Sequence, residues 1–182
     1  MRAAVTPHLY TMNKFSLPNT LEEFLCIDIV ESGKFFADEL FRRKFGHSPP
    51  DFGRHIVLFY RDANLALHVA SYLHLWTTGT IGLIGGGCTD GRTIRLMSES
   101  ERLAIDNAGG LLLQTLRYAF DRHEEGLQAF FGHCGNDRAL AVDLRAGFLR
   151  TEDPNLLVRW NRDLSESTRA TLFEQALALG SF

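Results

Sequence analysis

The sequence predicts a mixed α/β fold of the α+β kind, with about six to seven strands and helices flanking the sheet. Amphipathic helical segments alternate along the chain with runs that are rich in β-branched and aromatic residues. The chain has 182 residues, of which 45% are hydrophobic and 14 are phenylalanine. A chain of this size buries most of its unfolded surface. We therefore expect an irregular N-terminal arm over residues 1–19 and a single domain with an aromatic-rich core over residues 20–182.

The segment that follows the arm allows two structures. Thr20 and Glu23 have the spacing of a capping box, which starts a helix. Phe24–Ile29 is rich in strand-forming residues and predicts a first strand. Both alternatives stay open from the sequence.

Residues 33–45 predict an amphipathic helix. Phe36, Leu40 and Phe41 share one face, and charged residues occupy the other. Gly46 ends this helix, because glycine readily adopts the left-handed conformation of a helix C-cap.

Two strands of a hairpin follow, at His55–Arg61 and Ala66–Thr77, joined by a turn at residues 62–64. Alternation along the second strand predicts two faces. One face carries Leu67, Val69, Ser71, Leu73 and Leu75, and the other carries His68, Ala70, Tyr72, His74 and Trp76.

The remaining elements are predicted in a simple order. Residues 79–91 are rich in glycine and predict a flexible connection, and Thr93–Met97 predicts the next strand. A helix over residues 109–123, a strand at Gln128–Cys134 and a short helix after Asn136 come next. Residues 148–151 and 156–160 predict a hairpin, and a final amphipathic helix containing Leu172 and Leu177 ends at Gly180.

Composition excludes several classes of function. The formal net charge of −3 and the pI near 6.1 give no basic surface for nucleic acid or a membrane. Three cysteines without a C-x-x-C pair indicate reduced thiols in a cytoplasmic protein. No spacing of His, Cys, Asp or Glu predicts a metal site. We expect neither a nucleic-acid nor a membrane partner.

The segment Asn136–Phe148 carries the most specific motif. Asn136, Ala139, Val142 and Gly147-Phe148 match the pattern N-x-x-A-x-x-φ-Y-x-x-x-G-F, in which φ is apolar. This motif resembles the signature of the GCN5-related N-acetyltransferases, and Asp143 stands where that family usually has tyrosine. The order of elements resembles the same fold, a mostly antiparallel sheet with one parallel junction, splayed between strands four and five.

The resemblance implies a site for acetyl-CoA or another acyl-CoA as co-substrate. In that family the helix after strand four presents its first amides to the pyrophosphate, behind a loop Q/R-x-x-G-x-G/A. The loop matches in two registers, with either Gly109 or the pair Ala108 and Gly110 on the glycine positions, and both lack the basic residue. The implied cofactor-binding residues are Met97, Asn107, Ala108, Gly109, Gly110, Leu111 and Asn136.

Amine acylation needs a base for the amine and an acid for the departing thiolate. Asp143 occupies the position of the family's acid, although a carboxyl with an ordinary pKa near 3.9 is ionised at neutral pH. Glu99 lies just beyond the predicted strand four and is the candidate base. Cys134 follows His133 at the end of a strand and is a candidate acyl-accepting nucleophile.

Three functions follow as hypotheses. The first is transfer of an acyl group from a CoA thioester to an amine of a small molecule or protein. The second is an N-acyltransferase that depends on acyl-carrier protein, with Arg42 and Arg43 meeting an acidic carrier. The third is a catalytically silent binding module of the same fold. The oligomeric state stays open, a homodimer included.

Overall fold

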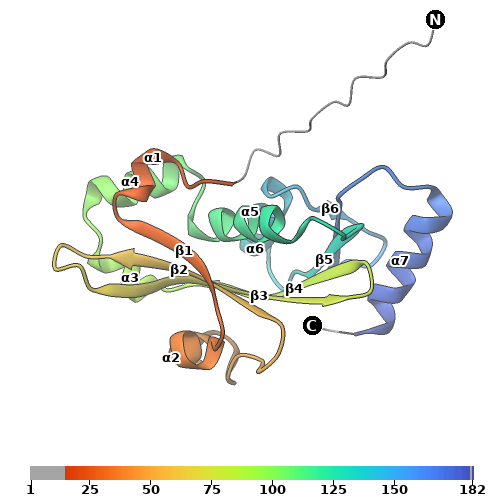
Figure 1. Cartoon of the computed structure of the whole chain (residues 1–182), viewed down its shortest axis with the longest axis horizontal. Helices are drawn as coiled ribbons and strands as arrows, with labels where there is room; N and C mark the ends of the chain where they lie inside the picture. The colour runs from red at the N-terminus through yellow and green to blue at the C-terminus, as the bar shows by residue number, and fades with distance from the viewer. Residues whose placement is uncertain (1–14, 181) are drawn as a thin grey trace, which may run out of the picture.

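The computed structural model describes residues 15–180 and residue 182. All the strands in this part of the chain join one seven-stranded sheet in the order β1-β2-β3-β4-β5-β7-β6 (Figure 1). The strands are β1 (Leu25–Val30), β2 (Arg54–Arg61), β3 (Leu67–Thr78), β4 (Ile81–Thr89), β5 (Ala129–His133), β6 (Leu149–Arg150) and β7 (Leu156–Trp160). The helices are α1 (Asn19–Glu22), α2 (Gly33–Phe45), α3 (Gly91–Leu96), α4 (Glu99–Asn107), α5 (Leu111–His123), α6 (Asp137–Arg145) and α7 (Glu166–Ala178).

The sheet has the predicted pairing. Every neighbouring pair of strands is antiparallel except β4 and β5, which run parallel from Ile81 opposite Ala129 to Ile84 opposite Gly132. The two predicted hairpins are confirmed as β2–β3 and β6–β7. The mixed, mostly antiparallel sheet with one central parallel junction is therefore confirmed.

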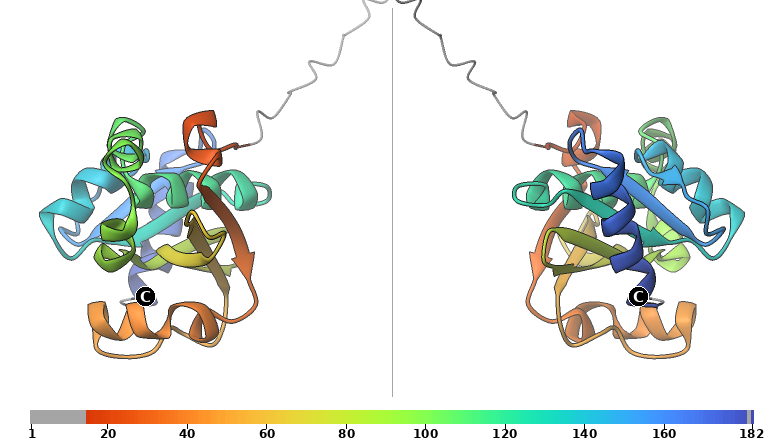
Figure 2. Two further views of the ribbon diagram at one scale, coloured as in Figure 1. Left: turned by 90° about the vertical axis from the view of Figure 1, so that its left-hand side faces the viewer. Right: turned by 90° about the vertical axis from the view of Figure 1, so that its right-hand side faces the viewer.

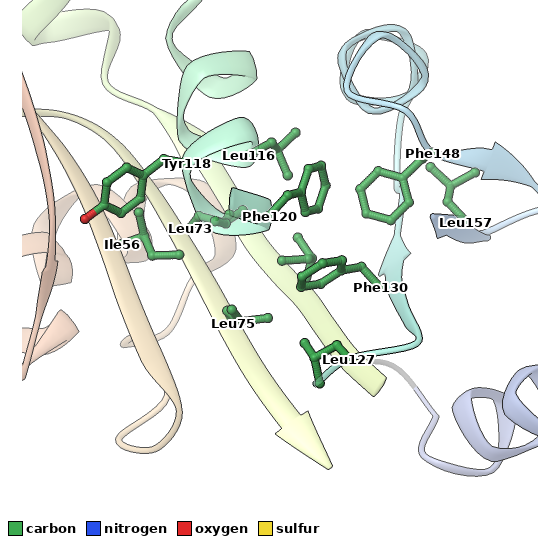
Figure 3. Close-up of a cluster of buried hydrophobic side chains, with 12 residues drawn as sticks. Ile56, Leu73, Leu75, Leu116, Tyr118, Phe120, Leu127, Phe130, Phe148 and Leu157 are labelled. Carbon is green, nitrogen blue, oxygen red and sulfur yellow. The ribbon is translucent and has the colours of Figure 1, made fainter. Parts of the chain in front are cut away.

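Helices cover both faces of the sheet, and Figure 2 shows α2 on the opposite side from α5. Leu116 and Phe120 of α5 pack with Leu73 and Phe130 in the largest core cluster (Figure 3). On the other face, α2 packs its residues Ala37, Leu40 and Phe41 on β2 and β3. Leu172 and Ala176 of α7 pack against β4, β5 and β7. The aromatic-rich core forms because adjacent residues of each strand point to opposite faces, and both faces are covered.

A register shift in the β2–β3 pair changes the predicted faces of β3. Leu58 pairs with Ser71 and Phe59 pairs with Val69, so Ala70 is an extra residue in the ladder. Ala70 consequently packs with Leu58 on the face of α1 and α4, and Val69 packs on the α2 face. The predicted alternation is wrong before this bulge, because one inserted residue reverses the facing of every side chain beyond it.

The region between residues 79 and 98 differs most from the prediction. The glycine-rich segment is strand β4 rather than a flexible connection, because β3 and β5 pair with it on both sides. Thr93–Met97 is not a strand: Thr93 lies in helix α3, and Met97 is the C-cap of that helix. The Asp90 carboxylate starts the helix by accepting a hydrogen bond from the Arg92 amide at 2.8 Å.

The predicted first strand is confirmed as β1, whereas the predicted capping box of Thr20 and Glu23 does not form. A one-turn helix α1 precedes β1, but it begins at Asn19 without a side-chain cap, and Glu23 is its C-cap. Residues 1–14 of the predicted arm lie outside the described residues. Helices α2 and α5 are confirmed, with Gly46 in the left-handed conformation (φ 83°) after α2. Helix α4, which the sequence analysis did not predict, begins with a capping box of Ser98 and Glu101. No helix in the described part of the chain is long and apolar enough to span a membrane.

Candidate active site

The parallel junction opens into a splay. Pairing between β4 and β5 stops at Ile84 and Gly132, while β4 continues to Thr89. Its next residues are Gly85, Gly86 and Gly87, and the β3–β4 register shifts beside them. Gly86 has φ 60°, and a Cβ there would lie 2.5 Å from the Phe41 ring. Glycine is therefore required at this bend, and the backbone of β4 beyond Ile84 is not paired with the diverging β5.

A cavity of about 520 Å³ lies at the open end of the splay. The ends of β4 and α4, the start of α5 and one face of α6 line it. Gly109 and Gly110 each have φ 97° and turn the chain sharply into α5. Helix α5 begins at Leu111, and because its N-cap is Gly110, no side chain caps its first amides. The first amides of α5 carry the positive end of the helix dipole, which suits an anion.

Basic side chains from three helices line the same cavity. Lys44 comes from α2, Arg102 from α4 and Arg138 from α6, and Asp106 is the acidic residue in the lining. Among the described residues, none of these three cations forms a salt bridge. The cavity thus carries excess positive charge, although the loop before α5 lacks the basic residue of the family pattern.

A smaller cavity of about 50 Å³ lies deeper in the splay. Apolar side chains and polar groups both line it, with the glycines of β4 on one side and α6 on the other. Asp143 and His133 are the titratable residues in the lining. A carboxyl group and an imidazole therefore share one small space beside the open backbone of β4.

Asp143 is half-buried on the inner face of α6. Burial raises the pKa of its carboxyl to about 6, and the nearby Cys134 thiol opposes this rise. The raised pKa reflects the cost of desolvating the charged form. A fraction of Asp143 is consequently protonated near neutral pH, so this side chain can donate a proton.

The two residues after Gly132 differ in their chemistry. The Cys134 thiol donates a hydrogen bond to the Asn136 carbonyl oxygen at 3.3 Å. Burial raises the pKa of this thiol, which disfavours the thiolate that a nucleophile needs. Burial lowers the pKa of His133, so its imidazole is neutral at physiological pH. The Nδ1 atom of His133 is buried and has no hydrogen-bond partner in the described structure.

The structure brings part of the predicted set together. Gly109, Gly110, Leu111 and Asn136 line the 520 Å³ cavity, and Asp143 lines the smaller one. Asn107 ends α4 and Ala108 is its C-cap, and neither lines the cavity. Met97 is 2% exposed and packs in the core near Leu21, because it follows a helix rather than ending strand four.

The candidate base is separated from this site. Glu99 lies exposed in the first turn of α4 and lines neither cavity of the splay. The sequence analysis missed His133, Lys44, Arg102 and Arg138 as site residues. The sequence signal for this site is the run of glycines in β4, because it marks the place where β4 and β5 diverge. Within the described residues, no three His, Cys, Asp or Glu side chains are grouped to hold a metal ion.

Comparisons with known proteins find similarity at the level of structure. No protein-family model matches the sequence, and a search of curated proteins finds no match. FdhC, a nucleotide-linked sugar GNAT, has a TM-score of 0.47 at 11% identity, covering 85% of this chain and 93% of its own. AtaTR bound with AcCoA has a TM-score of 0.41 at 17% identity, covering 83% and 99%. The KacTA–DNA complex has a TM-score of 0.41 at 18% identity, with the same coverage of 83% and 99%.

All three TM-scores are below 0.5, so the fold is assigned from the strand pairing of this chain. Separately, the expectation that nucleic acid is not a partner rests on net charge alone and stays a prediction. The mostly antiparallel sheet, its single parallel junction at β4 and β5, and the splay beyond Ile84 are those the resemblance predicts. This chain has the fold of the GCN5-related N-acetyltransferases.

Proposed function

We propose that this protein transfers an acyl group from a CoA thioester to an amine. The observation that carries the proposal is the splay between β4 and β5, where a cavity with cationic residues and a half-buried proton donor lie close together. A CoA thioester needs a binding site with two parts, a cationic part for its phosphates and an apolar, water-poor part for its reacting carbonyl.

The residues of the larger cavity fit the donor. The α5 amides after Gly110 and the side chains of Arg102 and Arg138 supply positive charge for phosphate groups. Asn136 lines the passage toward β5 and fits the polar amides of the pantetheine arm. Residues 85–87 of β4 are glycines and carry no side chains of their own toward the thioester, although Phe41, Leu73 and Leu112 pack close to them.

Asp143 supplies the acid in this proposal. The neutral amine nitrogen attacks the thioester carbonyl, a C–N bond forms, the C–S bond breaks and the nitrogen loses one proton to solvent. Protonated Asp143 then gives its proton to the departing sulfur and regains one from solvent. The carboxyl replaces the tyrosine of the family pattern with a group whose burial keeps it partly protonated.

Isothermal titration with acetyl-CoA and with longer acyl-CoAs tests the donor site. We expect saturable binding of at least one of them and release of free CoA thiol when amines are added. Failure of every acyl-CoA to bind would refute the proposal in its CoA form.

The carrier-protein alternative has less support from the geometry. Arg42 pairs with Asp38 at 2.8 Å, and Arg43 pairs with Asp90 at 2.7 Å. Both cations are thus engaged within the chain rather than presented to an acidic partner. Binding of acyl-carrier protein that is lost in an Arg42→Glu/Arg43→Glu variant would favour this alternative. A thiol-release assay over a panel of amines separates either enzyme from a silent binding module.

A further inference from the structure

A third cavity, of about 430 Å³, lies beyond the end of β5. Residues that follow β5, the β6–β7 turn and the end of α7 line it. Its volume is within the range that small-molecule sites occupy. The cavity that fits the CoA phosphates lies between α4, α5 and α6, so the two spaces have separate walls.

His133 connects this outer cavity to the splay. Its side chain lines both the outer cavity and the 50 Å³ cavity that contains Asp143. The Phe182 ring packs edge-on against the imidazole, with ring centroids 4.4 Å apart. The imidazole is thus held at the boundary between the two spaces. Its Nδ1 atom is buried and has no partner among the described residues. The neutral imidazole of His133 can accept a proton from a group that enters the outer cavity.

The outer cavity has one anionic wall and one apolar wall. Asp153 is half-buried, and its Oδ1 atom accepts hydrogen bonds from the amides of Asn155 at 2.8 Å and Leu156 at 3.2 Å. These bonds fix the carboxylate, which forms no salt bridge within the described structure. Leu177 of α7 supplies apolar surface in the same lining. A primary alkylammonium ion matches both walls, with its charge toward Asp153 and its alkyl stem along Leu177.

We propose that the outer cavity binds a primary alkylammonium acceptor and that His133 takes the proton which frees its nitrogen for attack. This inference rests on the proposed acyl transfer, because it places the second substrate of that reaction. The His133 imidazole accepts one proton from the ammonium, and the neutral amine nitrogen attacks the thioester carbonyl. The nitrogen loses its second proton to solvent as the amide forms. The sulfur takes the proton held by Asp143, and His133 later releases its own to solvent.

The binding half is tested on the full chain in the presence of saturating acetyl-CoA. The probes are n-butylammonium and its neutral counterpart n-butanol, with the His133 imidazole followed by NMR. We expect saturable shifts with n-butylammonium only, weakened at least tenfold in Asp153→Asn. Asparagine keeps an Oδ1 acceptor for the turn and removes the charge. Equal binding of n-butanol, or no saturable binding of n-butylammonium, would overturn the proposal.

The proton-transfer half is tested by thiol release with n-butylamine. His133→Gln should lower kcat/KM by about 10²-fold, the size typical of general-base catalysis, and should remove the limb of the pH profile in which the base titrates. The charged groups that line its two cavities are Asp143 and Asp153, so the profile is compared with those of Asp143→Asn and Asp153→Asn.

His123→Gln is the matched control. His123 is another half-buried histidine with a buried, unpartnered ring nitrogen, and it lines none of the cavities described above. Its replacement should leave kcat/KM and the pH profile unchanged. Unaltered turnover in His133→Gln, or binding of n-butylammonium without turnover in the wild type, would refute the role of His133. Absence of binding of every acyl-CoA to the wild type is a separate result, which refutes the acyl-transfer proposal itself.

Discussion

The Oδ1 atom of Asn136 accepts a hydrogen bond from the Ala139 amide at 3.0 Å. This bond caps α6, whose inner face carries Asp143 toward the splay. Asn136 itself lines the larger cavity. The asparagine of the motif thus has a local structural reason: it starts the helix that positions the proposed acid.

Removing this cap should cost stability. We expect Asn136→Ala to lower the free energy of unfolding by about 1 kcal/mol, which corresponds to about 2–4 °C in Tm for a chain of this size. Thermal denaturation measures the change. Asn136→Ser is the control, since serine restores the cap without the amide that faces the cavity. A Tm in Asn136→Ser as low as in Asn136→Ala would contradict the capping explanation.

Asp143→Asn should lower activity and raise stability. Because the pKa of Asp143 is raised to about 6 from 3.8, the folded state binds more protons than the unfolded state between about pH 4 and 6. The wild type therefore loses stability as pH rises through this window. We expect Asp143→Asn to be more stable at pH 7.5 by about 2 kcal/mol, as measured by urea denaturation, and its kcat to fall about 10²-fold.

The same group sets a prediction for the pH dependence of turnover. If protonated Asp143 is the acid, kcat should decrease as pH rises above about 6. Asp143→Tyr should move this decrease to higher pH, because the phenol of tyrosine has an ordinary pKa near 10. Thiol-release rates between pH 5 and 9 measure both. An identical profile in the two proteins would exclude Asp143 as the titrating acid.

Gly109→Ala should disturb the start of α5. A Cβ at Gly109 would lie 2.5 Å from the Arg145 guanidinium and 2.5 Å from Leu113 Cδ2, at φ 97°. This strain is worth about 1–3 kcal/mol, and we expect acetyl-CoA to bind at least about tenfold more weakly by isothermal titration, the equivalent of 1.4 kcal/mol.

Gly126→Ala is the matched control for this change. Gly126 also has a positive φ of 83°, but a Cβ there would meet nothing within 4 Å, and it lines none of the described cavities. Its replacement should leave acetyl-CoA affinity unchanged. An equal loss of affinity in both variants would attribute the effect to general destabilisation.

Acid should destabilise the α2 face of the sheet. His55 and His74 are 3% and 5% exposed, and burial lowers the pKa of both. Protons therefore bind the unfolded state more readily, and the stability that these residues give at neutral pH is lost as pH falls below about 6.5.

The Phe52 carbonyl provides a test of this effect. It accepts a hydrogen bond from His74 Nε2 at 2.7 Å, and the amide of glutamine can replace that donor. The urea midpoint of the wild type should drop between pH 7.5 and 5, and His74→Gln should drop less. A larger drop in His74→Gln would reverse the assigned sign.

Local patterns predicted most elements because their signals lie within a few residues. The apolar spacing and Gly46 locate α2, and Asn136 with Gly147 brackets α6. Strand β4 was missed because three successive glycines, Gly85–Gly87, carry no alternation of side chains. Its hydrogen bonds to β3 and β5 come from segments distant in sequence, which propensity does not include. Because Thr93–Met97 was predicted to be strand four, Met97 and Glu99 were predicted to be site residues, but neither lines the cavities of the splay.

The sequence by itself determined most of the elements, the fold class and the position of Asp143 on a short capped helix. Tertiary structure decided what these residues can do. Burial raises the pKa of Asp143, and three separate helices bring Lys44, Arg102 and Arg138 to one cavity. His133 lines both the outer and the inner cavity. Burial and the convergence of distant segments depend on packing of the whole chain, whereas helix caps and apolar periodicity depend on neighbours in the sequence.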